Sequence, residues 1–135
     1  MNRIGDAMSQ KTLLVVDDEA TIRTILVQVF KQAGYRVLCA SNGVQAMEVV
    51  NALPDPIDVL ITDMTMPLME GDELIERATA VRPGLKVICL SAAFSAVSLE
   101  KSVLFLPKPF GLKAVVSLVR SALEGTAQLR QVISG

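Results

Sequence analysis

Histidine is absent from the 135 residues of this chain. This absence removes both the commonest zinc ligand and the usual general base at neutral pH. Any chemistry that passes through a phosphorylated histidine must therefore take that residue from a partner protein. The chain also lacks an apolar run close to the roughly 18 residues that a membrane-spanning helix requires, and residues 1–10 lack the apolar core of a signal peptide. We therefore expect a cytoplasmic protein that does not bind membranes.

An excess of either charge sign is also missing. Lys and Arg number 13 and Asp and Glu number 14, so no long-range positive field attracts nucleic acid or anionic lipid. We expect a protein or small-molecule partner and no nucleic acid. Cysteine is scarce, and both Cys39 and Cys89 lie within apolar runs, where cysteine usually behaves as a small buried hydrophobe. A disulfide is therefore not expected.

The length and the 51% hydrophobic content fit one domain with one continuous core. We expect the folded domain to span residues 11–125. Residues 1–10 are expected to form a flexible N-terminal tail, and residues 126–135 a C-terminal tail or linker.

Short apolar runs alternate along the chain with segments of helical periodicity. Strands are expected over residues 12–16, 36–40, 59–62, 86–90 and 103–106. Helices are expected over residues 20–33, 46–53, 71–81 and 112–123, where apolar residues recur at helical spacing. Between the fourth and fifth strands the helical signal is weak, so a helix over residues 95–101 would be short or irregular.

Five strands alternating with five helices predict right-handed crossovers and a parallel sheet that is covered on both faces. We therefore expect an α/β protein with a flavodoxin-like doubly wound sheet in the strand order 2-1-3-4-5. Ligands of such sheets bind beyond the carboxyl ends of the strands, at the point where the strand order reverses.

Polar side chains follow four of the expected strands. Asp17 and Asp18 follow the first strand, Asp63 the third, Ser91 the fourth and Lys108 the fifth. If the first and third strands are neighbours, three carboxylates meet in one crevice and repel one another, so a cation must offset them. Since only oxygen ligands are available, magnesium is favoured over zinc.

A hard cation, a lysine and a hydroxyl around one carboxylate are the equipment for phosphoryl transfer, with Asp63 as the nucleophile. Each residue also has a simpler interpretation when taken alone. An acidic pair after a strand often caps the next helix, a serine at a strand end is usually a cap, and Pro-Lys-Pro is usually a rigid loop. Their joint placement at the ends of four strands favours the phosphoryl-transfer site.

These segments resemble bacterial response-regulator receiver domains, and the likeness extends over residues 11–125. The segments are Leu-Leu-Val-Val-Asp-Asp-Glu (13–19), Val-Leu-Ile-Thr-Asp-Met-Thr-Met-Pro (59–67) with Gly71, Val-Ile-Cys-Leu-Ser-Ala (87–92) and Phe-Leu-Pro-Lys-Pro-Phe (105–110). The resemblance implies a two-component phosphorelay in which Asp63 accepts a phosphoryl group from a phosphohistidine of a sensor histidine kinase or phosphotransfer protein.

The resemblance further implies how a magnesium ion would be held. Asp18, Asp63 and the backbone carbonyl of Thr65 would ligate it directly, and Asp17 would act through water.

It also implies a switch. Lys108 would pair with one phosphoryl oxygen and Ser91 would hydrogen-bond another, and Phe105, at the family's aromatic switch position, would rotate into the space that Ser91 vacates. Thr65 and Ala93 occupy positions that tune the lifetime of the phosphoryl group in the family.

The connection from Ser91 to Lys108 is shorter than in chemotaxis-type members of the family, so we expect the helix before the fifth strand to be truncated or irregular, which leaves the output face open. We expect a local order change over residues 92–103 on phosphorylation and a monomer that meets its partners near the site and the first helix.

Other functions remain open. A phosphatase with an aspartyl nucleophile is disfavoured, since Asp63-Met64-Thr65 lacks the second Asp that haloacid-dehalogenase-type phosphatases place two residues on. A pseudo-receiver that binds partners without phosphorylation usually loses an acidic residue or the lysine, and none is lost here. A further alternative is a receiver fragment of a hybrid histidine kinase. We expect no enzyme activity beyond self-catalysed phosphoryl transfer and autodephosphorylation.

Overall fold

The computed structural model describes residues 10–90 and 103–125, and the account of the fold refers to these residues. They form five strands and four helices. The strands are β1 (Thr12–Val16), β2 (Arg36–Ala40), β3 (Val59–Thr62), β4 (Lys86–Cys89) and β5 (Leu104–Phe105). The helices are α2 (Ala20–Gln32), α3 (Gly43–Ala52), α4 (Gly71–Val81) and α6 (Leu112–Glu124).

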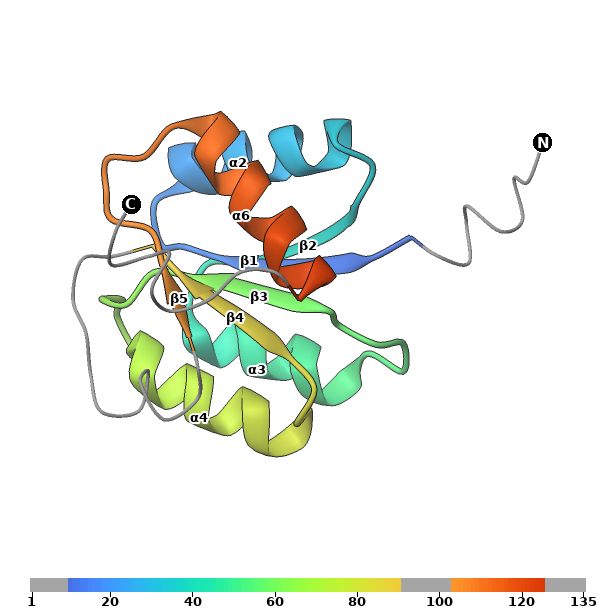
Figure 1. Cartoon of the computed structure of the whole chain (residues 1–135). Coiled ribbons are helices and arrows are strands. Elements are labelled where there is room, and N and C mark those ends of the chain that lie inside the picture. The colour runs from blue at the N-terminus through green and yellow to red at the C-terminus, as the bar shows by residue number, and fades with distance from the viewer. Residues whose placement is uncertain (1–9, 91–102, 126–135) are drawn as a thin grey trace.

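The strands form one parallel sheet in the order β2-β1-β3-β4-β5. Helices α2 and α6 cover one face of this sheet, and α3 and α4 cover the other (Figure 1). The predicted doubly wound fold and its strand order are therefore confirmed. Because β1 and β3 are neighbours, with Val16 opposite Thr62, the residues that follow these two strands leave the sheet side by side.

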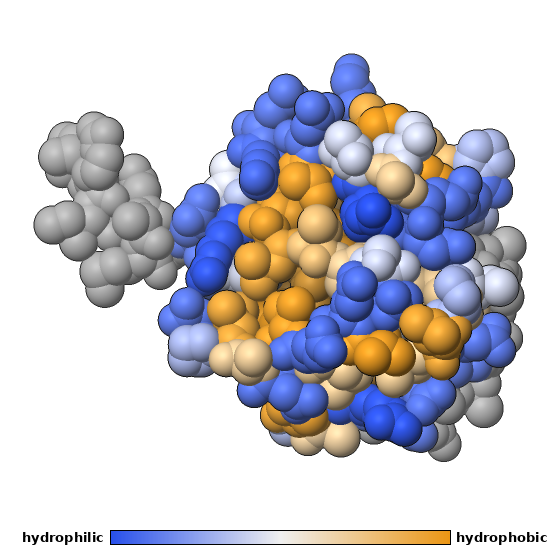
Figure 2. Space-filling view, turned by 180° about the vertical axis from the view of Figure 1, so that it is seen from behind, coloured by the Kyte–Doolittle hydropathy of each residue, from blue (hydrophilic) through white to orange (hydrophobic). Residues whose placement is uncertain are grey.

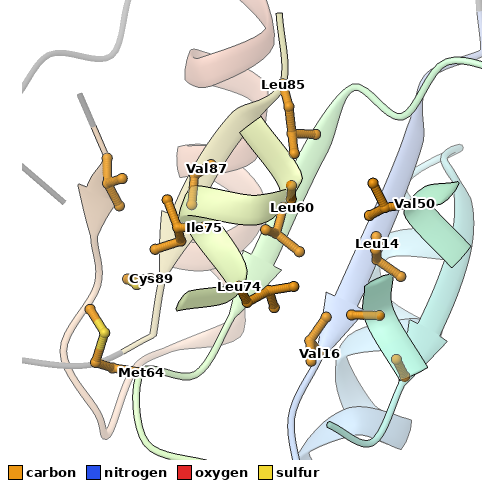
Figure 3. Close-up of a cluster of buried hydrophobic side chains, with 14 of the residues drawn as sticks. Leu14, Val16, Val50, Leu60, Met64, Leu74, Ile75, Leu85, Val87 and Cys89 are labelled. Carbon is orange, nitrogen blue, oxygen red and sulfur yellow. The ribbon is translucent and has the colours of Figure 1, made fainter. Parts of the chain in front are cut away.

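The core consists of two layers, one on each face of the sheet. Every residue of β1 and β3 is buried, which explains why these strands are continuous apolar runs rather than alternating ones. Side chains of a strand point alternately to the two faces. On the α3/α4 face, for example, the core contains Leu14, Val16, Leu60, Leu74 and Ile75 (Figure 3). On the α2/α6 face, it contains Leu13, Val15, Leu26, Phe30 and Val119.

The strand ends differ slightly from the expected ones. Strand β4 stops at Cys89, one residue early, and β5 has two residues instead of four. Pairing nevertheless continues beyond both strands, because the Leu90 N–H donates to the Thr62 carbonyl and the Leu106 N–H donates to the Cys89 carbonyl. The expected helix over residues 95–101 and almost all of the two tails lie outside the described residues.

The two cysteines are free thiols in different environments. Cys89 is buried, as expected, but the expectation of a buried Cys39 is wrong. Strand β2 is at the edge of the sheet, so that its Val37 and Leu38 are half-buried and Cys39 is exposed. An apolar run in the sequence thus marked a strand but not its place in the sheet.

Figure 2 shows an apolar band on the side of the molecule that faces away from the viewer in Figure 1.

No helix among the described residues is both long and apolar enough to cross a bilayer.

Arg82, in the loop between α4 and β4, holds the C-terminal end of α3. Its guanidinium donates to the carbonyl oxygens of Val50 (2.9 and 3.1 Å), Leu53 (2.6 Å) and Asp55 (3.0 Å). The last carbonyls of a helix have no partner within the helix, and Arg82 satisfies one of them, that of Val50, together with the carbonyls of Leu53 and Asp55 just beyond the helix. The interaction joins α3 to the start of β4 at the amino-terminal end of the sheet.

Candidate functional site: an acidic cluster at the carboxyl edge of the sheet

Three carboxylates meet where β1 and β3 end. Asp17 and Asp18 follow β1, and Asp63 follows β3. One carboxylate oxygen from each of the three residues lies within 4.8 Å of the other two. The structure therefore brings together the acidic residues whose convergence the strand ends predicted.

Asp17 is the most deeply buried of the three acids, with no exposed surface. Its Oδ1 accepts a hydrogen bond from the Glu19 N–H (2.9 Å), and its Oδ2 lies 3.3 Å from the Lys108 ammonium nitrogen. Burial raises the pKa of Asp17, and the Asp63 charge adds to the rise, which the Glu19 N–H and the Lys108 charge only partly offset. The site therefore favours additional positive charge.

Lys108 supplies one such charge from the loop after β5. Its Nζ lies 3.1 Å from Asp63 Oδ2, 3.3 Å from Asp17 Oδ2 and 3.6 Å from Glu19 Oε1. Burial lowers the pKa of Lys108, but the hydrogen bond to Asp63 and the charges of Asp17 and Asp63 outweigh it, so the pKa is raised. The lysine is held as a cation between the acids that precede α2 and the acid that follows β3.

The backbone around Asp63 is held closely. The Thr62 hydroxyl donates to the Asp63 carbonyl oxygen (2.8 Å), and the Gly71 N–H donates to the Met64 carbonyl oxygen (2.7 Å). A Cβ at position 71 would lie 2.7 Å from the Asp63 carbonyl oxygen. Glycine is therefore needed at the start of α4 for the helix to pack against the backbone of Asp63. The side chain of Asp63 keeps 13% of its surface exposed, which leaves it open to a small reactant.

The remaining predicted residues are placed less completely. Thr65 is exposed, and its N–H lies 3.4 Å from Asp63 Oδ1. Phe105 is buried in the core layer on the α3/α4 face, which also contains Met64 and Cys89. Ser91 and Ala93 lie outside the described residues, so the predicted relation of Ser91 to Phe105 remains a prediction.

Two residues that the sequence analysis did not single out border the site. Glu19 faces Lys108, and Arg23 on α2 donates from Nη1 to the Asp17 carbonyl oxygen at 2.7 Å. The sequence carried a signal for the second residue, because a basic side chain near the start of a helix is unfavourable there unless something offsets it.

The donor set fits a hard divalent cation. The groups that converge are carboxylates, which suit magnesium, and no sulfur or imidazole ligand joins them within the described residues. The charges also favour a bound cation, because the three acids carry more negative charge than the ammonium of Lys108, which lies among them, can offset. The carboxylates of Asp17, Asp18 and Asp63 are the groups that the structure brings together for such an ion.

Comparison with known proteins agrees with this geometry. A family model described as the response regulator receiver domain matches residues 13–120. The chain is 34% identical over 119 residues to the response regulator receiver protein CpdR of Brucella abortus, which covers 84% of this chain and 97% of that protein. It is 33% identical over 129 residues to the sensor kinase CckA of the same species. That match covers 92% of this chain but 14% of the kinase, so the chain spans a small part of that relative.

Solved structures show the same fold. A CheY-like receiver domain protein from Methanospirillum hungatei superposes with a TM-score of 0.80 at 26% identity, covering 87% of this chain and 97% of that one. The response regulator TrrA from Thermotoga maritima, solved in complex with Mg²⁺ and BeF, gives a TM-score of 0.75 at 27% identity and covers 84% of this chain and 100% of that one. With the family model matching most of its length and its carboxylates gathered at the expected edge of the sheet, this chain belongs to the response regulator receiver domains, the phospho-accepting domains of two-component signalling.

Proposed function

We propose that Asp63 is the phosphoryl acceptor and that its phosphorylation switches a protein-binding surface. The observation that carries the proposal is the position of the Lys108 ammonium between Asp63 and Asp17, with Asp18 beside them. A partly exposed carboxylate with a fixed cation on one oxygen can attack a phosphoryl group while the developing charge is stabilised.

The transfer is a substitution at phosphorus. An Asp63 carboxylate oxygen forms a bond to the phosphorus atom of a phosphohistidine on a histidine kinase or phosphotransfer protein. The P–N bond breaks, its electron pair stays on the imidazole nitrogen, and the donor leaves as histidine. In autodephosphorylation a water oxygen attacks the same phosphorus and releases inorganic phosphate, and the Asp63 carboxylate is restored.

Magnesium, when bound, would neutralise charge on the phosphoryl oxygens. Asp18, Asp63 and the Thr65 carbonyl would ligate it, with Asp17 acting through water. Lys108 would move its hydrogen bond from Asp63 Oδ2 to a phosphoryl oxygen, a short step because its Nζ is already 3.1 Å from the carboxylate. Ser91 would bind another phosphoryl oxygen.

The acceptor is tested with acetyl phosphate and Mg²⁺ as the donor system. We expect intact-mass measurement to show one added phosphoryl group on the wild type and none on Asp63→Asn. The matched control is Asp55→Asn, because the exposed Asp55 lies in the loop before β3, at the other end of the sheet from Asp63, and pairs with Arg36 instead of Lys108. Equal labelling of Asp63→Asn and the wild type would overturn the assignment, and an unlabelled wild type would favour a pseudo-receiver.

We also propose where the protein donor docks. A groove of about 440 Å³ lies between α2 and the loop from β5 to α6, with Lys108 among its lining residues. The apolar residues that line it are Ile22, Ile25, Leu26, Pro109, Phe110 and Leu112. Ile25 is 40% exposed and Leu112 is 44% exposed, and with the other apolar lining residues they form a contiguous apolar patch of the kind that marks interaction sites. The occupant would be an amphipathic helix of the donor, because such a helix fills an apolar groove with one face and could present a histidine to the neighbouring Asp63.

Ile25→Asp tests the docking groove. We expect this substitution to slow phosphorylation by a purified phosphohistidine-containing phosphotransfer protein at least tenfold and to leave phosphorylation by acetyl phosphate unchanged. Val81→Asp is the control, because Val81 has a similar exposure (48%) but lies at the end of α4 in the opposite helical layer. If the two variants respond alike to the protein donor, the groove is not the docking site.

The output and the compartment are further parts of the proposal. Ser91 and Phe105 would respond together to the phosphoryl group, and the protein would remain a monomer that acts in the cytoplasm. Light scattering before and after phosphorylation tests the oligomeric state.

A further inference from the structure

Arg23 folds back from the start of α2 onto the end of β1. Its Nη1 donates to the carbonyl oxygen of Asp17 at 2.7 Å, a short hydrogen bond from a charged donor. That carbonyl belongs to the peptide group that joins Asp17 to Asp18. The hydrogen bond therefore holds the plane of the peptide between the two acids.

The Asp17 side chain is held by contacts of its own, whereas the Asp18 side chain depends on the peptide between the two residues. Asp17 is fixed independently, because its N–H donates to the Ala40 carbonyl and its carboxylate is held by the Glu19 N–H and by Lys108. Asp18 is exposed, and within the described part of the chain no hydrogen bond or ion pair holds its carboxylate. The direction of the Asp18 side chain therefore depends on the backbone, which Arg23 holds.

The placement of Arg23 is unfavourable for the helix itself. Helix α2 has no acidic residue in its first turn and no side-chain cap at Glu19. A guanidinium that reaches toward the N-terminal end meets the positive end of the helix dipole. A local arrangement that breaks the usual preference is typical of residues that serve a site. The nearby carboxylates offset this repulsion.

We propose that Arg23 is a positioning residue of the magnesium site. Its hydrogen bond to the Asp17 carbonyl orients Asp18 so that the Asp18 carboxylate remains beside Asp63. The inference rests on the proposed function only in taking Asp18 and Asp63 as the magnesium ligands.

The direction in which Mg²⁺ affinity changes when Arg23 is replaced separates positioning from simple electrostatics. Removal of a positive charge next to a cation site should strengthen Mg²⁺ binding if charge alone matters. Removal of the hydrogen bond should weaken binding if Arg23 acts by orienting Asp18. Residues that orient metal ligands typically change metal affinity by about 10–100-fold.

The test is a Mg²⁺ titration of the unphosphorylated protein, followed by amide NMR shifts. We expect Arg23→Met, which keeps the aliphatic stem without a donor, to bind Mg²⁺ at least about tenfold more weakly. Arg23→Lys keeps a charged donor and should recover much of the affinity. Arg77→Met is the control for loss of one arginine, because Arg77 forms an exposed pair with Glu73 on α4. Unchanged or tighter binding by Arg23→Met would overturn the proposal.

Stability and labelling are measured beside affinity. A merely structural role would lower the melting temperature of Arg23→Met without magnesium and leave the Mg²⁺ affinity of the folded fraction unchanged, and that result would also overturn the proposal. If Arg23→Met does not fold, Arg23→Lys decides: affinity slightly below the wild type supports positioning, and tighter binding contradicts it. Wild-type protein that binds Mg²⁺ but is not labelled by acetyl phosphate would overturn the proposed function and leave the role of Arg23 intact.

Discussion

The two ends of the parallel sheet use charged residues for opposite purposes. At the amino-terminal end, charged groups satisfy the backbone: Arg82 binds three carbonyl oxygens, and the carboxylate of Asp58 accepts from the Thr12 N–H at 2.8 Å. At the carboxyl end, the acids of β1 and β3 face one another and share one lysine. The first arrangement stabilises the fold, whereas the second holds repelling charges together.

This difference indicates that stability and chemistry can be altered separately. Substitutions at the carboxyl end should change ligand affinity strongly and stability little, or even favourably. Substitutions at the amino-terminal end should do the reverse. Three substitutions test this contrast, in order of decreasing expected effect.

Asp18→Ala should have the largest effect. It removes a proposed direct ligand, so we expect Mg²⁺ affinity to fall by at least the roughly 100-fold that is the upper range for orienting residues. Because the substitution also relieves repulsion with Asp17 and Asp63, the melting temperature without magnesium should not fall. Calorimetric titration and thermal unfolding measure the two quantities. Equal Mg²⁺ affinity in Asp18→Ala and wild type would show that the ligand set is wrong.

Arg82→Ala should show the opposite pattern. Loss of a charged donor to the carbonyls of Val50, Leu53 and Asp55 should lower the free energy of unfolding by roughly 2–3 kcal/mol, since hydrogen bonds to charged groups contribute about 1.5–3 kcal/mol and do not add fully. Mg²⁺ affinity should stay unchanged. Urea denaturation measures the loss.

The control for Arg82→Ala is Arg36→Ala. Arg36 forms an exposed ion pair with Asp55, with side chains 41% and 58% exposed, and such pairs contribute about 1 kcal/mol or less. A loss at Arg82 no larger than that at Arg36 would contradict the role given to the carbonyl contacts.

Asp17→Asn should have the smallest effect and the opposite sign. Since the pKa of Asp17 is raised in the folded protein, stability from this group is present below its unfolded pKa and is lost as pH rises through the folded pKa. At pH 7 the neutral amide should therefore raise the free energy of unfolding of the magnesium-free protein, by about 1 kcal/mol or less. The gain should shrink as the pH is lowered. Thermal unfolding of the variant and the wild type at pH 7 and at successively lower pH values is the measurement. A variant less stable than the wild type at pH 7 would contradict the expectation.

The sequence predicted the sheet well because its central strands, β1 and β3, are buried on both faces. A run such as residues 59–62 has few alternatives, and the polar residue that ends it marks the edge of the sheet. The convergence of Asp17, Asp18 and Asp63 followed from strand order alone. The fold and the acidic part of the site were therefore predictable from local pattern plus topology.

The partners of long side chains, and the exposure of residues on the strand at the edge of the sheet, were not predictable from the sequence. The sequence indicates that Arg23 needs an offsetting partner near the start of its helix, but not that it binds the Asp17 carbonyl. Nothing in the sequence indicates that Arg82 binds three carbonyls of another segment, because long flexible side chains have several partners within reach. Cys39 was misjudged for a related reason, because an apolar run does not reveal whether a strand has a neighbour on both sides. These features depend on tertiary contacts.

The different environments of the two thiols allow selective chemical labelling of one of them. Burial, with the charges of Asp72 and Asp63, raises the pKa of the Cys89 thiol to about 12, so this thiol stays protonated and unreactive toward alkylating reagents near neutral pH. Cys39 is exposed on the edge strand. Because the chain has two cysteines, a maleimide dye should attach at one defined position without mutagenesis. The native protein could then be tethered or followed by fluorescence while its phosphoryl acceptor remains unmodified.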